Sequence, residues 1–556
     1  MTNNDIVHKL WNLCDILRDD GINYSDYVSE LVLLLFIKMV HENTEAGTLK
    51  KHPLPIGCRW QDICDKSGIN LLNDYKAILF ALSTGKRLEA DPENPGQTKE
   101  VQVHEDSLIS AIYADAQTRL REPRHLEQII KTLEKIDWFS AAKDGLGDLY
   151  EGLLEKNASE TKSGAGQYFT SRALINCMVR CMKPQVGEVI QDPAAGTAGF
   201  LVAADQYMRE QTDDYFDLNS KQSEFQKNNA FVGVELVPNT RRLALMNCLL
   251  HGMEGDDEGV IHLGNALGDA GKALKGADII LANPPFGTSK GGEASNTRDD
   301  LTYKTGNKQL AFLQHIYRNL KPGGRAAVVL PDNVLFEAGV GTDVRRDLMN
   351  KCNLHTILRL PTGIFYAQGV KTNVLFFTKG SITDKHQQEN CTESVWVYDL
   401  RTNMPSFGKR TPFGNSDIGF TQQDFGLDPH LGAFEKVFDP VDRDLSRQQD
   451  IATILAARIQ GEYSFGAEQI AVDKQAAVEN ENVDDKLLHS RWRCFNRDWI
   501  ANTKGDSLDI SWLKDKDSVD AADLPEPDVL AREAKDELTA ALSELDELLA
   551  VLEGAN

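Results

Sequence analysis

Apolar positions recur with two different spacings along this chain. Through residues 1–150 they return every three or four positions, as on one face of an α-helix, so we expect a mainly helical region there. Further along, short apolar runs are bounded by glycine, proline or polar residues, which predicts buried strands. These runs cover residues 188–192, 231–236, 260–263, 278–282, 325–330 and 372–378. Helical segments lie between them, and such alternation indicates an α/β fold.

Length and composition narrow the class of protein. With 556 residues the chain is too long for one hydrophobic core, so we expect about two to four domains. Neither a secretory segment nor an apolar run long enough to span a bilayer is visible. The nine cysteines include no CxxC pair, which argues against a zinc site or a disulfide framework. We therefore expect a cytoplasmic protein with no metal site and no membrane partner.

The charge balance bears on nucleic acid as a partner. The chain has 60 basic and 84 acidic residues, a formal net charge of −24. Contacts to phosphates need lysine and arginine, so this balance argues against a chain that wraps nucleic acid by itself. If DNA is the substrate, the positive surface is local or belongs to a partner.

The apolar run at residues 278–282 leads directly into Asn283-Pro284-Pro285-Phe286. Proline fixes φ near about −65° and restricts the residue before it to extended backbone. We therefore expect the Asn283 amide oxygen and the Pro284 carbonyl to be two fixed acceptors beside an aromatic ring. Such a set suits a planar amine, with Phe286 stacked on its ring. The alternative is a proline-terminated core strand without chemistry.

These four residues match a specific chemical need. The exocyclic amine of adenine is a poor nucleophile because its lone pair is delocalised into the ring. Holding both hydrogens out of the ring plane pushes the nitrogen towards sp³ and directs the lone pair at an electrophile. Catalysis of this kind works by positioning and preorganised dipoles and needs no strong base. We call residues 283–286 the catalytic segment.

Three other predicted strand ends carry residues that suit a nucleoside cofactor. Residues 192–200, Asp-Pro-Ala-Ala-Gly-Thr-Ala-Gly-Phe, form a glycine turn into a helix, where a ligand can approach the backbone at the carboxyl end of a strand. Glu235 ends the next strand, at an offset that suits the two hydroxyls of a ribose. Asn265 follows the third strand, where its amide suits an adenine edge. The ordered set predicts one nucleoside crevice beside one amine-binding site.

Upstream of these strands, residues 157–163 are predicted to be a linker, and the chain then reads Gly164-Ala-Gly-Gln-Tyr-Phe-Thr170-Ser171-Arg172. Thr170 or Ser171 is placed to cap a helix that begins at Arg172. By itself this segment indicates only the start of a helix.

The glycine-rich stretch at residues 287–309 is predicted to be a long loop, which in a compact domain is usually functional or disordered. We hypothesise that it is a basic lid over DNA; an inert loop is the alternative. Phe365 and Tyr366 are candidates for a second stacking wall, with core packing as the alternative. The lid hypothesis rests on Lys290, Arg298, Lys304 and Lys308.

The C-terminal part has a different character. Residues 476–485 are predicted to be a linker. Residues 491–497 interleave arginine with aromatic residues, a pattern that can bind nucleic acid, although a partner interface or local packing is favoured here. From Pro525 onward there are nine acidic and two basic residues, and leucines recur at heptad spacing, which predicts a helix that docks on another helix. These leucines are Leu538, Leu542, Leu545, Leu549 and Leu552.

Together these residues resemble the N6-adenine DNA methyltransferases, and they are similar over nearly the whole chain to the modification (M) subunits of type I restriction-modification enzymes, of the EcoKI-like (type IA) group. The resemblance departs at three places: Ser171 stands where the family usually has proline, Ala198 where many relatives have glycine, and Asn265 where aspartate is frequent. The resemblance is carried by residues 166–170, 192–200, 283–286 and, most specifically, 363–373.

The resemblance implies a Rossmann-like, S-adenosylmethionine-dependent methyltransferase domain at residues 156–435. A helical N-terminal domain at residues 1–155 and a C-terminal region at residues 436–556, ending in a helical tail, would flank it. Target adenine is implied to bind at Asn283, Pro284, Pro285 and Phe286. The cofactor is implied to bind at Gln167, Tyr168, Phe169, Thr170, Ser171, Arg172, Asp192, Ala194, Gly196, Thr197, Ala198, Gly199, Phe200, Glu235 and Asn265.

The implied activity is site-specific methylation of adenine N6 in double-stranded DNA, with the target base flipped out of the duplex. The implied partners are a specificity (S) subunit that reads the DNA, a second modification subunit, and a restriction (R) subunit for cleavage of unmodified DNA. The N-terminal domain would clamp DNA or contact partners, and the terminal helix would dock on the specificity subunit. Two alternatives remain open: a methyltransferase for a protein glutamine amide or an RNA base, and a cofactor-binding scaffold without turnover.

Overall fold

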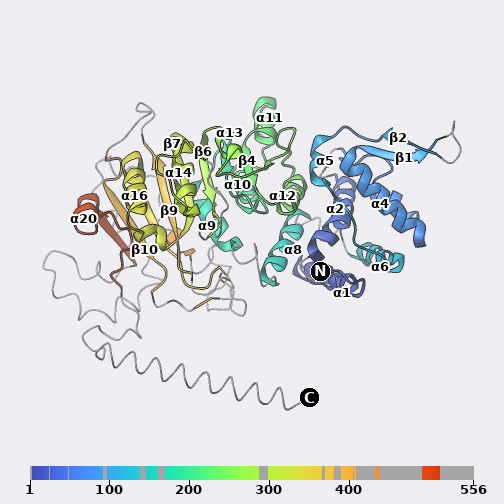
Figure 1. Cartoon of the computed structure of the whole chain (residues 1–556), viewed down its shortest axis with the longest axis horizontal. Helices are drawn as coiled ribbons and strands as arrows, with labels where there is room; N and C mark the ends of the chain where they lie inside the picture. Colours follow the sequence, from blue (N-terminus) through green and yellow to red (C-terminus); the bar gives the residue numbers. More distant parts are fainter. Residues whose placement is uncertain are drawn as a thin grey trace, which may run out of the picture. The chain divides into compact units, whose positions relative to one another are not determined.

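The chain divides into one compact unit at residues 1–511 and a second at residues 512–556, of which only 512 and 513 are described. Figure 1 shows the computed structural model. It describes residues 3–23, 26–47, 49, 51–91, 97–136, 138, 146–160, 170–286, 298–365, 370–380, 390–402, 404, 406–407, 413, 431–432, 434–435, 438 and 491–513.

The N-terminal part of the first unit is helical, as predicted, and is built around α2 (Tyr27–Glu45), in which every residue from Leu31 to Val40 is buried. One feature was not predicted: an antiparallel hairpin of β1 (Lys86–Ala90) and β2 (Thr98–Gln102). Its side chains are mostly exposed, so it carries no apolar alternation. The other helices are α1 (Asn3–Asp19), α3 (Trp60–Cys64), α4 (Gly68–Thr84), α5 (Ser107–Ile112), α6 (Pro123–Glu134) and α8 (Leu146–Glu160).

The rest of the first unit is organised by a nine-stranded sheet in the spatial order β11-β10-β8-β9-β7-β6-β3-β4-β5. Strands β7, β6, β3, β4 and β5 run parallel, whereas β9 is antiparallel to both β7 and β8. The strands are β3 (Ile190–Asp192), β4 (Phe231–Glu235), β5 (Ile261–Leu263), β6 (Ala277–Ala282), β7 (Leu320–Pro331), β8 (Cys352–Arg359), β9 (Thr372–Lys379), β10 (Ser394–Asp399) and β11 (Trp492–Asn496).

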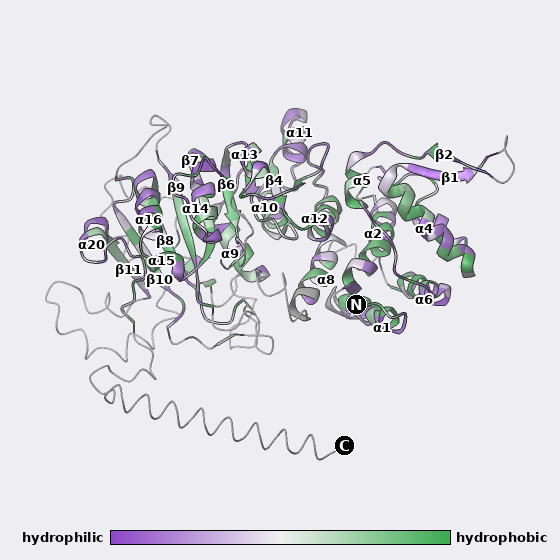
Figure 2. Cartoon of the chain, in the orientation of Figure 1, coloured by the Kyte–Doolittle hydropathy of each residue, from purple (hydrophilic) through white to green (hydrophobic). Residues whose placement is uncertain are grey.

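Helices connect and cover these strands, so the predicted α/β class and Rossmann-like sheet are confirmed. Figure 2 shows the strands as mainly hydrophobic, in keeping with burial in the sheet. The helices are α9 (Arg172–Met182), α10 (Gly199–Gln211), α11 (Ser220–Asn228), α12 (Pro238–Leu250), α13 (Asp269–Ala273), α14 (Lys308–Asn319), α15 (Asn333–Phe336), α16 (Val340–Lys351) and α20 (Arg497–Asn502).

The order of the strands places a switch point between β3 and β6. The chain leaves β3 through α10 towards β4 on one side, and leaves β6 through α14 towards β7 on the other. Because parallel crossovers are right-handed, α10 and α14 lie on opposite faces of the sheet. The turns that follow β3 and β6 therefore diverge, and a crevice opens at the carboxyl ends of these two strands, where open α/β sheets bind ligands.

Residues 491–511 return to this sheet. Strand β11 pairs antiparallel with β10, and Arg491 is buried with its guanidinium donating to the Asp399 and Thr402 carbonyls at 2.7 and 3.0 Å. The basic and aromatic pattern at residues 491–497 thus serves local packing, in agreement with one of the favoured interpretations. Within the described part of the chain, no helix combines the length and apolar composition that crossing a bilayer requires.

Candidate functional site

The site lies at the switch point, where β3 and β6 are neighbours: Ile190 pairs with Ile279 and Gln191 with Ile280. Strand β3 ends at Asp192, and β6 ends at Ala282, directly before Asn283. The turn at residues 192–198, which we call the cofactor turn, and the catalytic segment at residues 283–286 therefore leave the sheet side by side. Two motifs almost a hundred residues apart in sequence meet because their strands pair.

The cofactor turn is fixed by hydrogen bonds to its backbone. The Ala194 N–H donates to Asp192 Oδ1 at 2.9 Å, and the Ala195 N–H donates to the Val234 carbonyl at 3.0 Å. The Gly196 N–H donates to Glu235 Oε2 at 3.0 Å. The predicted ribose acid therefore also holds the glycine turn, so the spacing between these motifs has a structural reason.

Burial tunes both carboxyl groups of this crevice. Loss of hydration raises the pKa of Asp192 to about 8, against a smaller opposing effect of the Ala194 N–H, and the nearby Glu235 adds to the increase. Burial also raises the pKa of Glu235, while the backbone N–H groups of Val237 and Gly196 oppose the shift. The Val237 N–H donates to Glu235 Oε1 at 2.8 Å.

The surroundings of the turn fit a nucleoside cofactor. Gly196 has φ +54°, and a Cβ added there would meet no atom within 4 Å, so the backbone faces open space. Beside Glu235, Leu236 is 63% exposed, and Leu263 at the end of β5 is also exposed. Apolar side chains next to a carboxylate suit a flat base attached to a ribose. Sequence reasoning did not single out Leu236 or Leu263 for this role.

Two residues of this region have roles that the motifs did not specify. Asn265 Oδ1 accepts from the Leu267 N–H at 2.9 Å, so the side chain shapes the turn that follows β5. Ala198 is buried and adopts a left-handed φ of +68° at the N-cap of α10, a conformation that glycine adopts without strain. This accounts physically for the departure at Ala198 noted above: alanine occupies a position suited to glycine.

On the other side of the crevice, Asn283 is held by a residue from the segment before α9. Its Nδ2 donates to the buried Thr170 Oγ1 at 2.9 Å. The adjacent Ser171 is the N-cap of α9, accepting from the Leu174 N–H at 3.4 Å. Of the two capping candidates, Ser171 is the cap and Thr170 contacts the catalytic segment.

A second residue holds the catalytic segment from α14. The Gln309 side chain is 2% exposed, and its Nε2 donates to the Pro285 carbonyl at 3.2 Å. Asn307 caps the helix, with Oδ1 accepting from the Gln309 N–H at 2.9 Å. Gln309 was missed by sequence reasoning because it belongs to no recognisable motif and lies 24 positions from its partner.

Two aromatic rings meet beside Asn283. The half-buried Phe286 ring stands edge-on to the buried Phe365, with centroids 5.8 Å apart and an interplanar angle of 77°. Core packing is confirmed for Phe365, because its ring is buried. Its role as a stacking wall for a base stays a prediction. Tyr366 lies outside the described residues.

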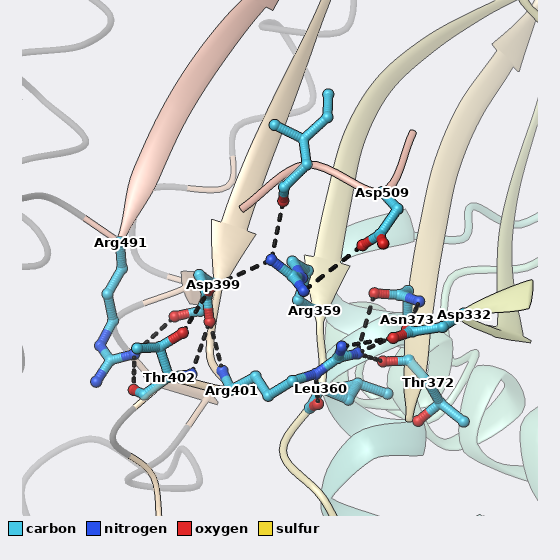
Figure 3. Close-up of polar contacts among 11 residues, drawn as sticks. Asp332, Arg359, Leu360, Thr372, Asn373, Asp399, Arg401, Thr402, Arg491 and Asp509 are labelled. Carbon is cyan, nitrogen blue, oxygen red and sulfur yellow. Dashed lines mark hydrogen bonds and ion pairs between the residues drawn. The ribbon is translucent and has the colours of Figure 1, made fainter. Parts of the chain in front are cut away.

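The segment that carries Phe365 is anchored by a cluster of arginines and aspartates, drawn in Figure 3. Arg401 forms a bidentate ion pair with Asp332, at 2.8 and 2.9 Å. The same guanidinium donates to the Leu360 carbonyl at 3.0 Å and the Thr372 carbonyl at 2.8 Å. It therefore joins the two ends of the segment at residues 361–371, which overlaps the stretch most specific to the family.

Arg298 does not fit the basic lid hypothesis. It is buried, donates to the Ala266 carbonyl at 3.1 Å and forms an ion pair with Asp300 at 2.6 Å. Its charge is used inside the protein, so the hypothesis is wrong for this residue. Lys304 is exposed, whereas Lys290 lies outside the described residues.

Comparisons with known proteins agree with this architecture. The N-6 DNA methylase family matches residues 141–442, the HsdM N-terminal domain family residues 6–133, and the C-terminal domain family of type I restriction enzyme methylase subunits residues 524–556. The EcoKI methylase subunit of Escherichia coli K12 is 52% identical over 99% of this chain and 95% of its own length. The chain belongs to the methylase subunits of type I restriction enzymes.

Further relatives of this methylase subunit support the same conclusion. The StySJI methylase subunit of Salmonella typhimurium is 51% identical over 99% of this chain and 95% of its own length. The crystal structure of the EcoKI M protein matches with a TM-score of 0.54 and 46% identity, covering 99% of this chain and 96% of that one. A type I R-M system structure at 23% identity, with a TM-score of 0.64 and complete coverage of both chains, shares the fold.

Membership of this family confirms the predicted activity, N6-adenine DNA methylation, and the predicted methyl donor, S-adenosylmethionine. It also places this methylase subunit among proteins that act in complexes with other subunits and DNA. Gln167, Tyr168, Phe169, the first part of the lid loop and the heptad leucines lie outside the described residues, so their predicted roles stay predictions. No three histidine, cysteine or acidic side chains gather as a metal site in the parts of the chain described.

Proposed function

We propose that the catalytic segment holds a flipped-out adenine, with the Asn283 amide oxygen and the Pro284 carbonyl accepting the two N6 hydrogens and Phe286 stacking on the base. The observation that carries this proposal is the bond from Asn283 Nδ2 to Thr170 Oγ1 at 2.9 Å. Because the amide nitrogen is directed at Thr170, the amide oxygen is directed elsewhere. The segment thus presents an acceptor without a charge.

The reaction requires no base of high pKa. S-adenosylmethionine supplies an electrophilic methyl group bound to a sulfonium sulfur. The bond from sulfur to carbon breaks as the bond from carbon to N6 forms, and N6 then releases one proton to solvent. The protein contributes the position of N6 and two neutral acceptors that favour the pyramidal nitrogen. Extruding the base costs a few kcal/mol, because the base loses its stacking and pairing in the duplex.

The cofactor is proposed to occupy the crevice between the cofactor turn and the strand ends of β4 and β5. Glu235 would accept hydrogen bonds from the ribose hydroxyls of the cofactor, and Leu236 and Leu263 would contact the base of the cofactor. The exposed position of both leucines and the open space above Gly196 support this arrangement. The remaining proposed contacts are those implied by the resemblance, at residues 167–172, 192, 194, 197–200 and 265.

We propose the same division of labour along the chain as the resemblance implies: residues 1–155 for DNA or partner contact, residues 156–435 for catalysis, and residues 436–556 for docking on a specificity subunit. A second copy of this subunit and a restriction subunit would complete the assembly. Cleavage of unmodified DNA would require the modification subunit together with the restriction subunit. The net charge of −24 supports delegation of DNA reading to another chain.

The test is methyl transfer from labelled S-adenosylmethionine to genomic DNA of a host that lacks the system. The subunit is co-expressed with its specificity partner, and the DNA is digested to nucleosides. Asn283→Ala is expected to lower the label in N6-methyladenine by about a hundredfold or more while cofactor binding persists. Asn239→Ala, an exposed asparagine on α12, is the matched control.

Full transfer by Asn283→Ala would remove Asn283 from the proposed role. Label in protein or RNA instead of DNA would favour the other methyltransferase alternative. Cofactor binding without label in any of these polymers would favour the scaffold.

A further inference from the structure

A partly buried chain of polar residues connects the cofactor turn to the helical N-terminal part. The Thr197 carbonyl accepts from Asn247 Nδ2 at 3.0 Å, and the same nitrogen donates to Glu151 Oε1 at 3.1 Å. The other carboxylate oxygen of Glu151 forms an ion pair with Arg172. Four residues from four separate segments are thereby joined across α8, α12, the cofactor turn and the start of α9.

The central residue of this chain is fully enclosed. Asn247 is 0% exposed, and both of its donor hydrogens are used by Glu151 and Thr197. A buried amide is costly unless it is hydrogen-bonded, so these two bonds strongly favour one orientation. Thr197 directly precedes Ala198, whose left-handed φ is strained. The hydrogen bond to the Thr197 carbonyl therefore restrains the turn next to its strained residue.

Glu151 reaches this position from a helix that belongs to both parts of the compact unit. Helix α8 packs on α1 and α2 in the helical part and on α12 beside the sheet. A second bond crosses the same boundary: Arg242 Nε on α12 donates to the Ile112 carbonyl at 2.9 Å. Arg242 contacts the helical part without contacting the cofactor turn in any bond described, so it allows a matched comparison.

We infer that Glu151 and Asn247 are positioning residues for the cofactor turn, through which the packing of α8 sets the affinity for S-adenosylmethionine. The inference rests on the proposed position of the cofactor and deepens it. Neither side chain is assigned a contact with the cofactor or with adenine. Asn247 acts through the Thr197 carbonyl, and Glu151 acts through Asn247 and through its ion pair with Arg172. Coupling of this kind is reciprocal, so cofactor binding would in turn stabilise α1, α2 and α8.

A graded series of variants tests the inference in the full chain co-expressed with its specificity partner. Glu151→Gln keeps an acceptor for Asn247 and loses the ion pair, whereas Glu151→Ala loses both. Asn247→Asp keeps the size of the side chain but replaces its two N–H donors by a carboxylate, which faces Glu151 and the Thr197 carbonyl. The Kd for S-adenosylmethionine is expected to rise by about threefold, tenfold and thirtyfold in that order.

Two further measurements separate positioning from general damage. At saturating S-adenosylmethionine, kcat is expected to stay within about twofold of the wild type, because the catalytic segment is untouched. In the wild type, S-adenosylmethionine should slow amide hydrogen exchange in α1 and α2, and this protection should weaken along the series. Arg242→Ala, which loosens the same boundary, should leave the Kd unchanged.

A Kd that is the same in all three variants would overturn the inference, as would an equal rise in Arg242→Ala. A fall in kcat without a rise in Kd would also overturn it. If the wild type transfers methyl groups and the series is flat, only this inference fails. If the wild type binds no S-adenosylmethionine, the proposed function fails with it.

Discussion

Two regions at the same edge of the sheet are built in opposite ways. The catalytic segment after β6 is held by neutral groups, the Thr170 hydroxyl and the Gln309 amide. Asp332 directly follows β7, and Arg401 follows β10. The cluster around these two residues is held by full charges. The difference matches the tasks that we propose: a charge beside Asn283 would compete with the target amine, whereas the paired charges anchor the segment that carries Phe365.

The charged cluster is more costly to disturb because its members satisfy one another. Burial alone would raise the pKa of Asp332, yet its hydrogen bonds and charge interaction with Arg401 lower this pKa below the ordinary value. Asn373 Nδ2 adds a bond to Asp332 Oδ1 at 2.7 Å. Removing one member therefore leaves another half-buried and charged without its partner. We expect stability to suffer first in the cluster and the methylation rate to suffer first in the catalytic segment.

The largest expected effect is the loss of Asp332. Asp332→Ala leaves the half-buried Arg401 guanidinium without its carboxylate, so the free energy of unfolding should fall by about 3 kcal/mol, the lower end for a pair shielded from solvent. Urea unfolding followed by circular dichroism measures this change. The double variant Asp332→Leu with Arg401→Met should recover much of the loss, because no unpaired charge remains. A loss below 1 kcal/mol in the single variant, roughly the value of a surface pair, would contradict burial of this pair.

A smaller effect, of a different kind, is expected at Thr170. Thr170→Val keeps the shape and removes the acceptor for Asn283 Nδ2, so kcat should fall by about tenfold to thirtyfold. The free energy of unfolding should change by about 1 kcal/mol or less. Single-turnover methylation and urea unfolding on the same preparations measure both quantities. Thr170→Ser restores the hydroxyl and should restore most of the rate; a rate as low as that of the valine variant would argue against the hydrogen bond.

The cofactor turn gives a pH-dependent prediction, because it contains the titratable carboxyl group of Asp192. The pKa of Asp192 is about 8 in the folded protein, above the ordinary value near 3.8, so the folded state binds the proton more tightly. The contribution of Asp192 to stability is therefore full below about pH 4 and falls as the pH rises towards about 8.

Asp192→Asn removes this titration while keeping an acceptor for the Ala194 N–H. The variant should gain about 1–2 kcal/mol relative to the wild type between about pH 6 and pH 7. Urea unfolding of both proteins at the two pH values measures the gain. An identical difference at both values would show that Asp192 does not titrate in this range.

The smallest effect is expected at Ala198. Its φ of +68° strains an alanine, and glycine adopts this conformation freely. Ala198→Gly should raise the free energy of unfolding by about 0.5–1 kcal/mol, because relief of strain exceeds the added freedom of the unfolded chain. Thermal unfolding measures this shift. A clear loss of stability would mean that the buried methyl group contributes more through packing than the backbone loses through strain.

Much of the fold could be predicted from local pattern. The strands that lead to Asp192, Glu235 and Asn283 are short, apolar and bounded by glycine or proline, so each can be predicted from a window of about ten residues. The hairpin of β1 and β2 could not be found this way, because its exposed side chains carry no alternating pattern. A short strand can therefore be predicted from the sequence when it is buried, and it escapes prediction when its side chains are exposed.

The supports of the site could not be predicted, because each acts over a long separation. Thr170 lies 113 positions from Asn283, and Glu151 lies 96 positions from Asn247. Arg298 shows the converse error: a basic residue in a polar stretch was interpreted as a surface charge, and the fold buries it against Asp300. Charge in a sequence does not reveal whether a partner will be close enough to bury it.

The sequence by itself determined the α/β class and the order of the strands along the chain, and it predicts the chemistry of Asn283-Pro284-Pro285-Phe286, because these depend on neighbouring residues and on the fixed geometry of proline. Only the tertiary structure decided which strands pair, and hence that the cofactor turn and the catalytic segment meet at one switch point. It also decided that neutral side chains support Asn283 while paired charges anchor Phe365. Hydrogen bonds and ion pairs are short-range in space, so their partners are set by folding rather than by position in the chain.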